Sequence, residues 1–241
     1  MKKFLIRWLV LGLGIIGIVV LFFIFKKDRT SQVCQEFEIE FRDNATPFIS
    51  KSEIQKYLAK DTIRFVGQRI DEIDLSKIES ALNQNPYIQN ADCYIRMNGL
   101  LVIDIAQKTP VLRVIPLEKP SYYLDENGDP FPLSARHTSD VKVATGHIKP
   151  SLNTKLYTFT SYVNQSTFWN SLIEQIFVRP NGDLIFTTQM GGHEVVVGDN
   201  DRLEQKLQKL EQFYQRASTN LGWEKYREIN LKFKDQVICK K

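Results

Sequence analysis

The sequence predicts an α+β fold that follows a single N-terminal transmembrane helix. Three observations lead to this prediction: an uncharged apolar run near the amino terminus, a strand–helix–helix–strand–strand order in residues 35–109, and short strands with one long amphipathic helix in residues 110–241. Hydrophobic residues make up 43% of the 241 positions, which is ample for one or two packed cores.

The apolar run extends from Trp8 to Phe25, 18 residues without a charge or a proline. At about 1.5 Å per residue, a helix of that length spans about 27 Å, close to the thickness of the bilayer hydrocarbon. A cleaved signal peptide has a shorter apolar run, of about 7 to 15 residues, and a small-residue cleavage site. No such site follows Phe25, and a lipoprotein signal at Cys34 would lie too far from the run. We therefore predict an uncleaved anchor, with a tail at 1–7, a transmembrane helix at 8–25 and a linker at 26–34.

The charges that flank the anchor do not determine its orientation. Each side carries three basic residues, which are Lys2, Lys3 and Arg7 before the helix and Lys26, Lys27 and Arg29 after it. The positive-inside count is therefore a tie, but long domains translocate largely regardless of nearby charge. The charge pattern thus permits a folded part outside the cytoplasm without requiring it.

Composition argues against two classes of protein. The net charge is only +4 and the basic residues are scattered, so there is no basic stripe of the kind that binds nucleic acid. Cys34, Cys93 and Cys239 lie far apart and form no C-x-x-C pair, which argues against a disulfide framework and against a zinc site. We expect them to be buried or incidental thiols, and we predict no metal and no cofactor.

The folded part begins with a period-two alternation that is typical of a half-buried strand. One face carries Val33, Gln35, Phe37, Ile39 and Phe41, and the other carries Glu36, Glu38, Glu40 and Arg42. Ser50 and Glu53 then form a capping box, which predicts the start of a helix with Ile54, Tyr57 and Leu58 on its buried face.

A second helix and a hairpin complete this first domain. The helix is expected to start near Asp74 and to stop by Asn85, because Pro86 disfavours the helical conformation in the residue before it. Alternating strands follow at 91–97 and 101–106. Asn98-Gly99 between them predicts a type I′ turn, which needs positive φ at both central residues. The predicted order is therefore β-α-α-β-β.

Several segments of this domain match a known pattern in order and in residue type; they lie at 73–78, 85–91, 101–105 and 107–111. They resemble a POTRA domain and, more narrowly, the bacterial cell-division family FtsQ, also called DivIB. Tyr87 stands where the family frequently has tryptophan. Gln107 stands where an acidic residue is frequent, so the resemblance implies no ion pair at this position.

The second half is expected to be a mixed β domain with a long helix near its C-terminal end, and it also resembles the FtsQ family. The expected strands flank 125–129 and lie at 141–146, 173–178, 184–188 and 194–198. Residues 125–129 also hint at a calcium loop, but Pro130 and Arg136 stand where such a loop needs glycine and glutamate.

The long helix is predicted to start at Asp201, with Glu204 completing a capping pair, and to end at 220–222. Its apolar residues keep to one face and are expected to belong to the core; they are Leu203, Leu207, Leu210, Tyr214 and Ala217. The chain then closes with a last strand at 229–233, where apolar and polar residues alternate again.

The sequence contains no signature of an enzyme. His137, His147 and His193 form no H-x-x-x-H or H-E-x-x-H pair, and G-x-S-x-G, P-loop and G-x-G-x-x-G motifs are absent. We therefore predict a non-enzymatic protein without a small-molecule substrate. The alternatives are a membrane-anchored extracytoplasmic hydrolase and a POTRA-type protein-assembly or secretion factor, which usually repeats the POTRA unit.

The family resemblance implies a scaffold of the bacterial cell-division complex. It implies that the chain binds two small single-pass proteins, FtsB (DivIC) and FtsL, outside the cytoplasm, and that it links early and late division proteins at the septum. It also implies a cytoplasmic tail at 1–7 in the inner membrane, and a last strand that receives a strand from the FtsB-like partner. The expected partner-binding residues are Ile229, Leu231, Lys232, Phe233, Lys234, Val237 and Ile238. The alternative is an ordinary edge strand whose lysines guard against aggregation.

Overall fold

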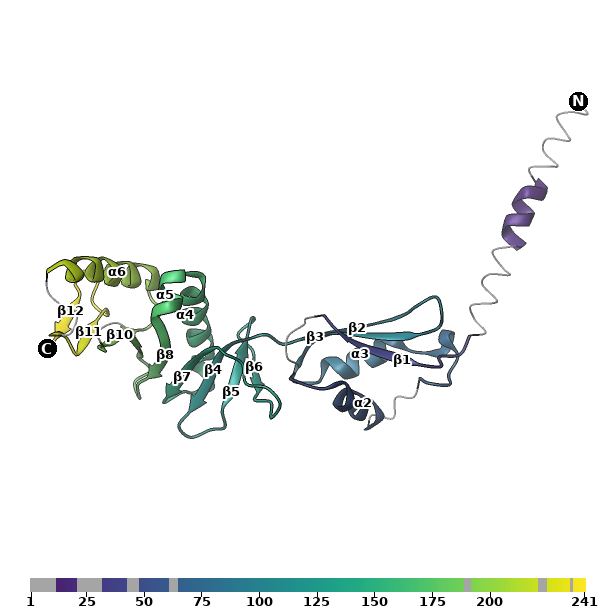
Figure 1. Ribbon diagram of the computed structural model, residues 1–241, viewed down its shortest axis with the longest axis horizontal. Helices are drawn as coiled ribbons and strands as arrows, with labels where there is room; N and C mark the ends of the chain where they lie inside the picture. The colour runs from purple at the N-terminus through teal and green to yellow at the C-terminus, as the bar shows by residue number, and fades with distance from the viewer. Residues whose placement is uncertain are drawn as a thin grey trace, which may run out of the picture. The chain divides into compact units, whose positions relative to one another are not determined.

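The computed structural model describes residues 12–20, 32–42, 48–60, 65–188, 192–220, 225–234 and 236–241 (Figure 1). The chain divides into two compact units, Met1–Gln107 and Lys108–Lys241, each with its own hydrophobic core.

Half of the predicted membrane anchor lies among the described residues. Residues 12–20 form a helix, and they are the described part of the segment predicted at 8–25. The tail at 1–7, the two ends of that segment and the linker up to residue 31 lie outside the described residues. Within the part of the chain that the structure describes, no helix is both long enough and apolar enough to cross a membrane.

The N-terminal unit packs two helices against a three-stranded sheet. The sheet order is β1-β3-β2, with β1 parallel and β2 antiparallel to the central strand β3. The elements are β1 (Phe37–Phe41), α2 (Lys51–Lys60), a 3₁₀ turn η1 (Ile70–Glu72), α3 (Leu75–Asn83), β2 (Ile88–Ile95) and β3 (Leu101–Gln107). The predicted β-α-α-β-β order is confirmed. The core joins the buried faces of both helices to the sheet; its members include Ile39, Ile54, Leu58, Ile78, Leu82, Ile103 and Ile105.

The capping box predicted for the first helix is present at the start of α2. The N–H of Glu53 donates to Ser50 Oγ at 3.2 Å, and the N–H of Ser50 donates to Glu53 Oε2 at 2.8 Å. Gln107 supports the same turn, because its Oε1 accepts from the N–H of Phe48 at 2.8 Å. The amide oxygen of Gln107 therefore orders the entry into α2.

Side chains from α3 occupy the outer edge of β2. The N–H of Ala91 donates to Asn83 Oδ1 at 2.9 Å, and the N–H of Cys93 donates to Glu79 Oε1 at 2.7 Å. These two donors would otherwise be available to another strand. The helix thus covers the sheet from one side and seals its edge.

The hairpin between β2 and β3 has a different turn from the one predicted. Of the two central residues, only Gly99 has a positive φ, of 85°, whereas a type I′ turn needs two. The N–H of Gly99 donates to the carbonyl of Arg96 at 2.9 Å, and the N–H of Arg96 donates to the carbonyl of Leu100 at 2.9 Å. The loop therefore has three residues, and it places its glycine at the left-handed position instead of forming the tight two-residue turn.

The C-terminal unit contains a nine-stranded mixed sheet of order β12-β11-β10-β9-β8-β7-β4-β5-β6. Its strands are β4 (Pro110–Pro116), β5 (Tyr122–Asp125), β6 (Pro130–Pro132), β7 (Lys142–Gly146), β8 (Ile173–Val178), β9 (Leu184–Thr188), β10 (Glu194–Gly198), β11 (Glu228–Asn230) and β12 (Ile238–Lys240). The helices are η2 (Pro150–Leu152), α4 (Asn153–Gln165), α5 (Thr167–Leu172) and α6 (Leu203–Asn220). The predicted mixed β domain with its long helix is confirmed.

The core of this unit lies between the helices and one face of the sheet. Phe159 of α4, Trp169 of α5 and Leu207 of α6 pack in one cluster with Phe186 and Val195 of the sheet. Helices α4 and α5 were not among the predicted elements. A helical spacing was nevertheless present in α4, whose buried positions are Leu156, Phe159, Thr160 and Val163.

The long helix α6 begins at Leu203 and not at Asp201 as predicted. Arg202 has a left-handed conformation with φ of 52°, which a helix cannot continue through. The N–H of Leu203 donates to the carbonyl of Asn200 at 3.2 Å, while the carboxylate of Asp201 pairs with Arg202 Nε at 3.1 Å. The expected apolar stripe is buried at Leu203, Leu207, Leu210 and Tyr214, and the side chain of Ala217 lies outside the described residues.

Replacing Ser50 with alanine tests the capping box. The change removes one acceptor for the first N–H groups of α2, and we expect a loss of about 1 kcal/mol in the local stability of this helix. Amide hydrogen exchange across 51–60 in the full-length protein should become about fivefold faster. Ser76→Ala, an exposed serine within α3, is the matched control and should leave exchange in α2 unchanged. Equal rates in both variants would contradict the assignment.

Candidate functional site

The two edges of the nine-stranded sheet differ in their capacity to accept another strand. At one edge, β6 consists of Pro130, Phe131 and Pro132, so two of its three residues have no N–H to donate. At the other edge, β12 consists of Ile238, Cys239 and Lys240 and contains no proline. Only the β12 edge therefore offers the donors that strand pairing needs.

In β12, the backbone N–H and C=O groups that point away from β11 are those of Cys239. The N–H of Arg227 donates to the carbonyl of Lys240 at 2.9 Å, so the polar groups of Lys240 point toward β11. Because successive residues of a strand direct their N–H and C=O groups to opposite sides, those of Cys239 point to the open edge. In the described ranges, no strand pairs with that side of β12.

The last strand predicted at 229–233 requires a correction. The structure ends β11 at Asn230, and β12 pairs antiparallel with its outer side, with Cys239 opposite Ile229. The chain turns because Asn230 Oδ1 accepts from the N–H of Lys232 at 3.0 Å, a local bond that competes with strand pairing. The sheet edge is therefore β12, not the strand through Ile229.

The predicted partner-binding residues nevertheless lie at this end of the sheet. Ile229 and Leu231 are buried in the core, at 0% and 2% exposure. Phe233, in the bend between β11 and β12, is 51% exposed. Val237 is partly buried against the core and Ile238 is half-buried in β12, while Lys232 and Lys234 are exposed.

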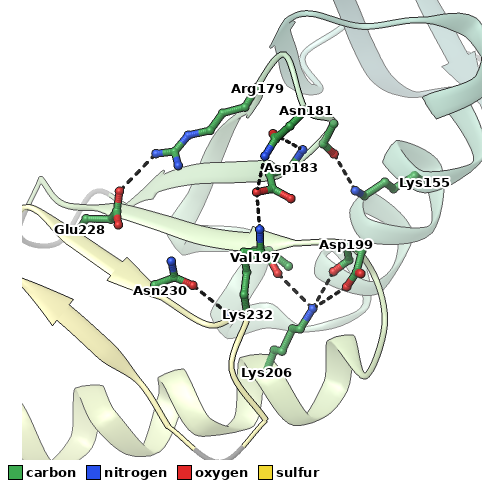
Figure 2. Close-up of polar contacts among 11 residues, drawn as sticks. Lys155, Arg179, Asn181, Asp183, Val197, Asp199, Lys206, Glu228, Asn230 and Lys232 are labelled. Carbon is green, nitrogen blue, oxygen red and sulfur yellow. Dashed lines mark hydrogen bonds and ion pairs between the residues drawn. The ribbon is translucent and has the colours of Figure 1, made fainter.

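A network of ion pairs surrounds the edge, and Figure 2 shows the part that lies between the β8–β9 turn and the segment around β11. Arg179 Nη2 lies 3.2 Å from Glu228 Oε2, and Lys232 Nζ lies 2.7 Å from Asp183 Oδ2. Glu228 Oε1 also lies 2.6 Å from Lys240 Nζ. The network thus runs from the β8–β9 turn to the edge strand.

Glu228 is the carboxylate that joins β11 to β12 in this network. The hydrogen bond from Lys240 holds the pKa of Glu228 below its ordinary value; burial opposes this shift and the hydrogen bond from Arg179 adds to it. Glu228 therefore stays ionised at neutral pH and keeps both cations in place.

A second polar group in Figure 2 fixes the start of α6 against β10. Lys206 is 5% exposed, and its Nζ donates to the carbonyls of Val197 at 3.0 Å and Asp199 at 2.9 Å. The same ammonium lies 2.8 Å from Asp199 Oδ1, which lowers the pKa of that carboxyl. A buried lysine needs such partners, because an unpaired buried charge is costly.

A buried polar pair lies between α6 and β10. His193 is 1% exposed, and its Nε2 lies 2.7 Å from the hydroxyl of Tyr214. Its Nδ1 is buried and has no hydrogen-bond partner among the described residues. Burial lowers the pKa of His193 and raises the pKa of Tyr214, so both groups are neutral near pH 7.

Two family models match most of the chain. A family model described as FtsQ/DivIB, C-terminal related, matches residues 109–240, and a model described as a POTRA-like domain matches residues 32–106. The first match alone covers more than half of the 241 residues. The chain belongs to the FtsQ/DivIB family.

Two curated relatives carry the name cell division protein FtsQ. The protein of Myxococcus fulvus is 23% identical over 178 residues, which are 67% of this chain and 61% of that protein. The protein of Rhodothermus marinus is 24% identical over 203 residues, which are 78% of this chain and 71% of that protein. The match to the first relative thus spans about three fifths of its length. These relatives support a role in cell division.

Sequence reasoning missed Cys239, Arg179 and Asp183. A strand of three residues is too short to show an alternation, so β12 gave no signal of its own. Arg179 and Asp183 lie on either side of residues 180–182, but their ion-pair partners lie 49 residues away along the chain. Only the folded chain brings these charges together.

The buried imidazole predicts a pH dependence of stability. Since the pKa of His193 is lowered in the folded state, the unfolded state binds more protons below about pH 6.5, and stability is lost as the pH falls through that value. The free energy of unfolding should drop by up to about 1 kcal/mol between pH 7.5 and 5.5.

Replacing His193 with glutamine should flatten this dependence, as measured by denaturant unfolding at several pH values. His147, which is exposed, provides the matched control: His147→Gln should retain the slope of the unaltered chain. An unchanged slope in His193→Gln would assign the pH dependence to other groups.

Proposed function

We propose that this family member is a non-enzymatic scaffold of the bacterial division complex. It binds FtsB (DivIC) and FtsL outside the cytoplasm and links early and late division proteins at the septum. The observation that supports this proposal best is the sheet with one proline-blocked edge and one open edge, because an open edge in a folded domain is a ready site for strand addition.

Strand addition explains why the C-terminal residues are arranged as they are. An incoming strand of the FtsB-like partner would bond to the N–H and C=O groups of Cys239 and lie beside Ile238. Phe233 is exposed next to this edge and would give an apolar anchor of the kind that dominates interfaces. Ile229, Leu231 and Val237 hold the edge from the core side, and Lys234 presents an exposed charge beside Phe233.

The rest of the chain would serve this interaction by confining it to the membrane surface. In this proposal the tail at 1–7 is cytoplasmic, the helix at 8–25 spans the inner membrane, and a linker at 26–34 leads to a POTRA domain at 35–109 and a β domain at 110–241 outside the cytoplasm. A shared membrane raises the effective concentration of partners that are anchored in it. The anchor therefore contributes tethering and the β domain contributes contact.

A proline at the outward residue of β12 tests the binding edge. Cys239→Pro removes the N–H that points to the open edge and leaves the groups of Ile238 and Lys240 that face β11. We expect affinity for the FtsB-like protein of the same bacterium to fall at least about tenfold. Copurification and titration calorimetry with the full-length protein in detergent measure the effect.

Cys239→Val is the matched control, because it keeps the N–H and fills the same half-buried position. It should bind as the unaltered chain does. Unfolding temperatures of both variants show whether the sheet is intact. Full binding by Cys239→Pro with an unchanged unfolding temperature would remove this edge from the interface.

The proposed topology is tested with reporters fused after Lys241. A reporter enzyme that is active only outside the cytoplasm should be active in this position, and a reporter that needs the cytoplasm should be inactive. The charge tie around the anchor does not dictate this result, so the assay decides it. Activity of the cytoplasmic reporter alone would refute the proposed orientation.

A further inference from the structure

The β8–β9 turn holds both ends of β11, although β9 and β10 lie between them in the sheet. Arg179, before the turn, binds Glu228 at the first residue of β11, with Nη2 and Oε2 3.2 Å apart. Asp183, after the turn, binds Lys232 just beyond β11, with Oδ2 and Nζ 2.7 Å apart. Figure 2 shows both contacts reaching the same turn.

The turn itself is rigid enough to act as a support. The N–H of Arg179 donates to the carbonyl of Asp183 at 3.0 Å, and the N–H of Gly182 donates to the carbonyl of Arg179 at 2.9 Å. Lys155 of α4 ties the turn to the body of the domain, with its Nζ 2.6 Å from the carbonyl of Gly182. The two opposite charges on either side of the turn are therefore held at a fixed spacing.

The side chain of Lys232 packs against Gly198 at the end of β10, where the absence of a Cβ atom leaves room for it. A Cβ atom at Gly198 would lie 2.8 Å from Lys232 Cγ and 3.1 Å from Cδ, closer than packing allows. Gly198 also has a positive φ of 79°, which glycine adopts without strain. The lysine stem thus lies against Gly198 in space that a side chain at this position would narrow.

Asp183 is suited to receive this lysine. Its side chain is only 16% exposed, and Asn181 Nδ2 donates to the same Oδ2 at 2.9 Å. Burial opposes ionisation, yet the hydrogen bonds from Lys232 and Asn181 hold the pKa of Asp183 below its ordinary value. An ion pair with one shielded partner is screened less by salt than a fully exposed pair.

The Arg179–Glu228 and Asp183–Lys232 ion pairs form a clamp that acts on the residues that the partner would meet. Lys232 directly precedes the exposed Phe233, and Lys209 of α6 donates to the carbonyl of Lys234 on its other side. The residues on both sides of Phe233 are thus held in place. Glu228, which binds Arg179, also pairs with Lys240 of β12. Preorganised interface residues lose less entropy on binding, so such a clamp favours affinity.

We propose that Arg179 and Asp183 are positioning residues of the partner-binding edge, and that Lys232 supports binding through Asp183 and not by contact with the partner. This inference rests on the proposed function, because it assigns the support of the same edge. It differs from the sequence-based expectation in one respect that is open to experiment. If Lys232 contacts the partner directly, its positive charge is needed at position 232. If Lys232 acts through Asp183, the positive and negative side chains can be swapped between positions 183 and 232 without loss of binding.

The test is a charge exchange within the pair, measured as affinity of the full-length protein for the FtsB-like partner. Asp183→Lys leaves two positive charges facing each other, and Lys232→Glu leaves two negative charges. Each variant should weaken binding roughly five- to twentyfold. The double variant Asp183→Lys/Lys232→Glu restores an ion pair and should bind within about threefold of the unaltered chain. Lys119→Glu makes the same charge change on an exposed lysine between β4 and β5, far from β12 in the sheet order, and serves as the control.

Amide exchange at 238–240 gives a second readout that a partner contact alone would not change. Each single variant should accelerate exchange in β12 without partner present, and the double variant should slow it again. Where a single variant lowers the unfolding temperature of the whole domain, the milder pair Asp183→Asn and Lys232→Met replaces it in a double-mutant cycle. Non-additive effects of that pair on affinity are expected for a clamp.

Two results would overturn the inference. One is a double variant that binds as weakly as Lys232→Glu, which would make Lys232 a direct contact. The other is normal binding by both single variants while Cys239→Pro abolishes binding, which would leave the edge as the site but without this support. Normal binding by Cys239→Pro with an unchanged unfolding temperature would instead remove the β12 edge of the proposed function from the interface, so the two failures are distinguishable.

Discussion

The structure depends on one constraint of open β-sheets: a sheet that does not close must end in two strands whose outer N–H and C=O groups lack a partner. The chain meets this constraint differently at each edge. The β6 edge has prolines at Pro130 and Pro132, and the β2 edge of the N-terminal unit is bonded by Asn83 and Glu79 of α3. In the nine-stranded sheet, the β12 edge has neither protection, and ion pairs link it to β11 and to the β8–β9 turn.

The polar contacts and the apolar core support that edge from opposite sides. On the inner face, Ile229 and Leu231 join the same core as Leu207 and Tyr214 of α6, so β11 cannot move without opening the core. On the other side, charged groups reach β11 from the β8–β9 turn. A three-residue strand has little stability of its own, and the structure compensates by anchoring its neighbours instead.

Local features of the fold could be predicted from the sequence, because they depend on neighbouring residues. The capping box of Ser50 and Glu53 is an interaction over three positions, and it formed as expected. The hairpin at Asn98-Gly99 was located correctly but its turn type was wrong, since Asn98 did not adopt the positive φ that a two-residue loop requires. Turn geometry follows from how the two strands meet, which the dipeptide alone does not determine.

Features at the candidate site depend on distant residues and were harder to predict. The alternation at 229–233 suggested one strand, but Asn230 bonds to Lys232 and ends it early. The return of β12 onto β11 follows from that bend and from burial of Val237, neither of which a period-two pattern contains. Helix α4 is a different case, because the apolar residues Leu156, Phe159 and Val163 have a helical spacing that the sequence itself contains.

The prolines of β6 have a consequence for how assemblies of this protein can grow. Edge-to-edge addition propagates into fibres only when each added unit presents a fresh acceptor edge at its far side. In the nine-stranded sheet, a strand or a second sheet that joins at β12 meets two prolines at the opposite edge, where pairing stops. If a strand adds at β12, further growth through this sheet therefore stops at the opposite edge, because the β6 residues Pro130 and Pro132 have no N–H to donate.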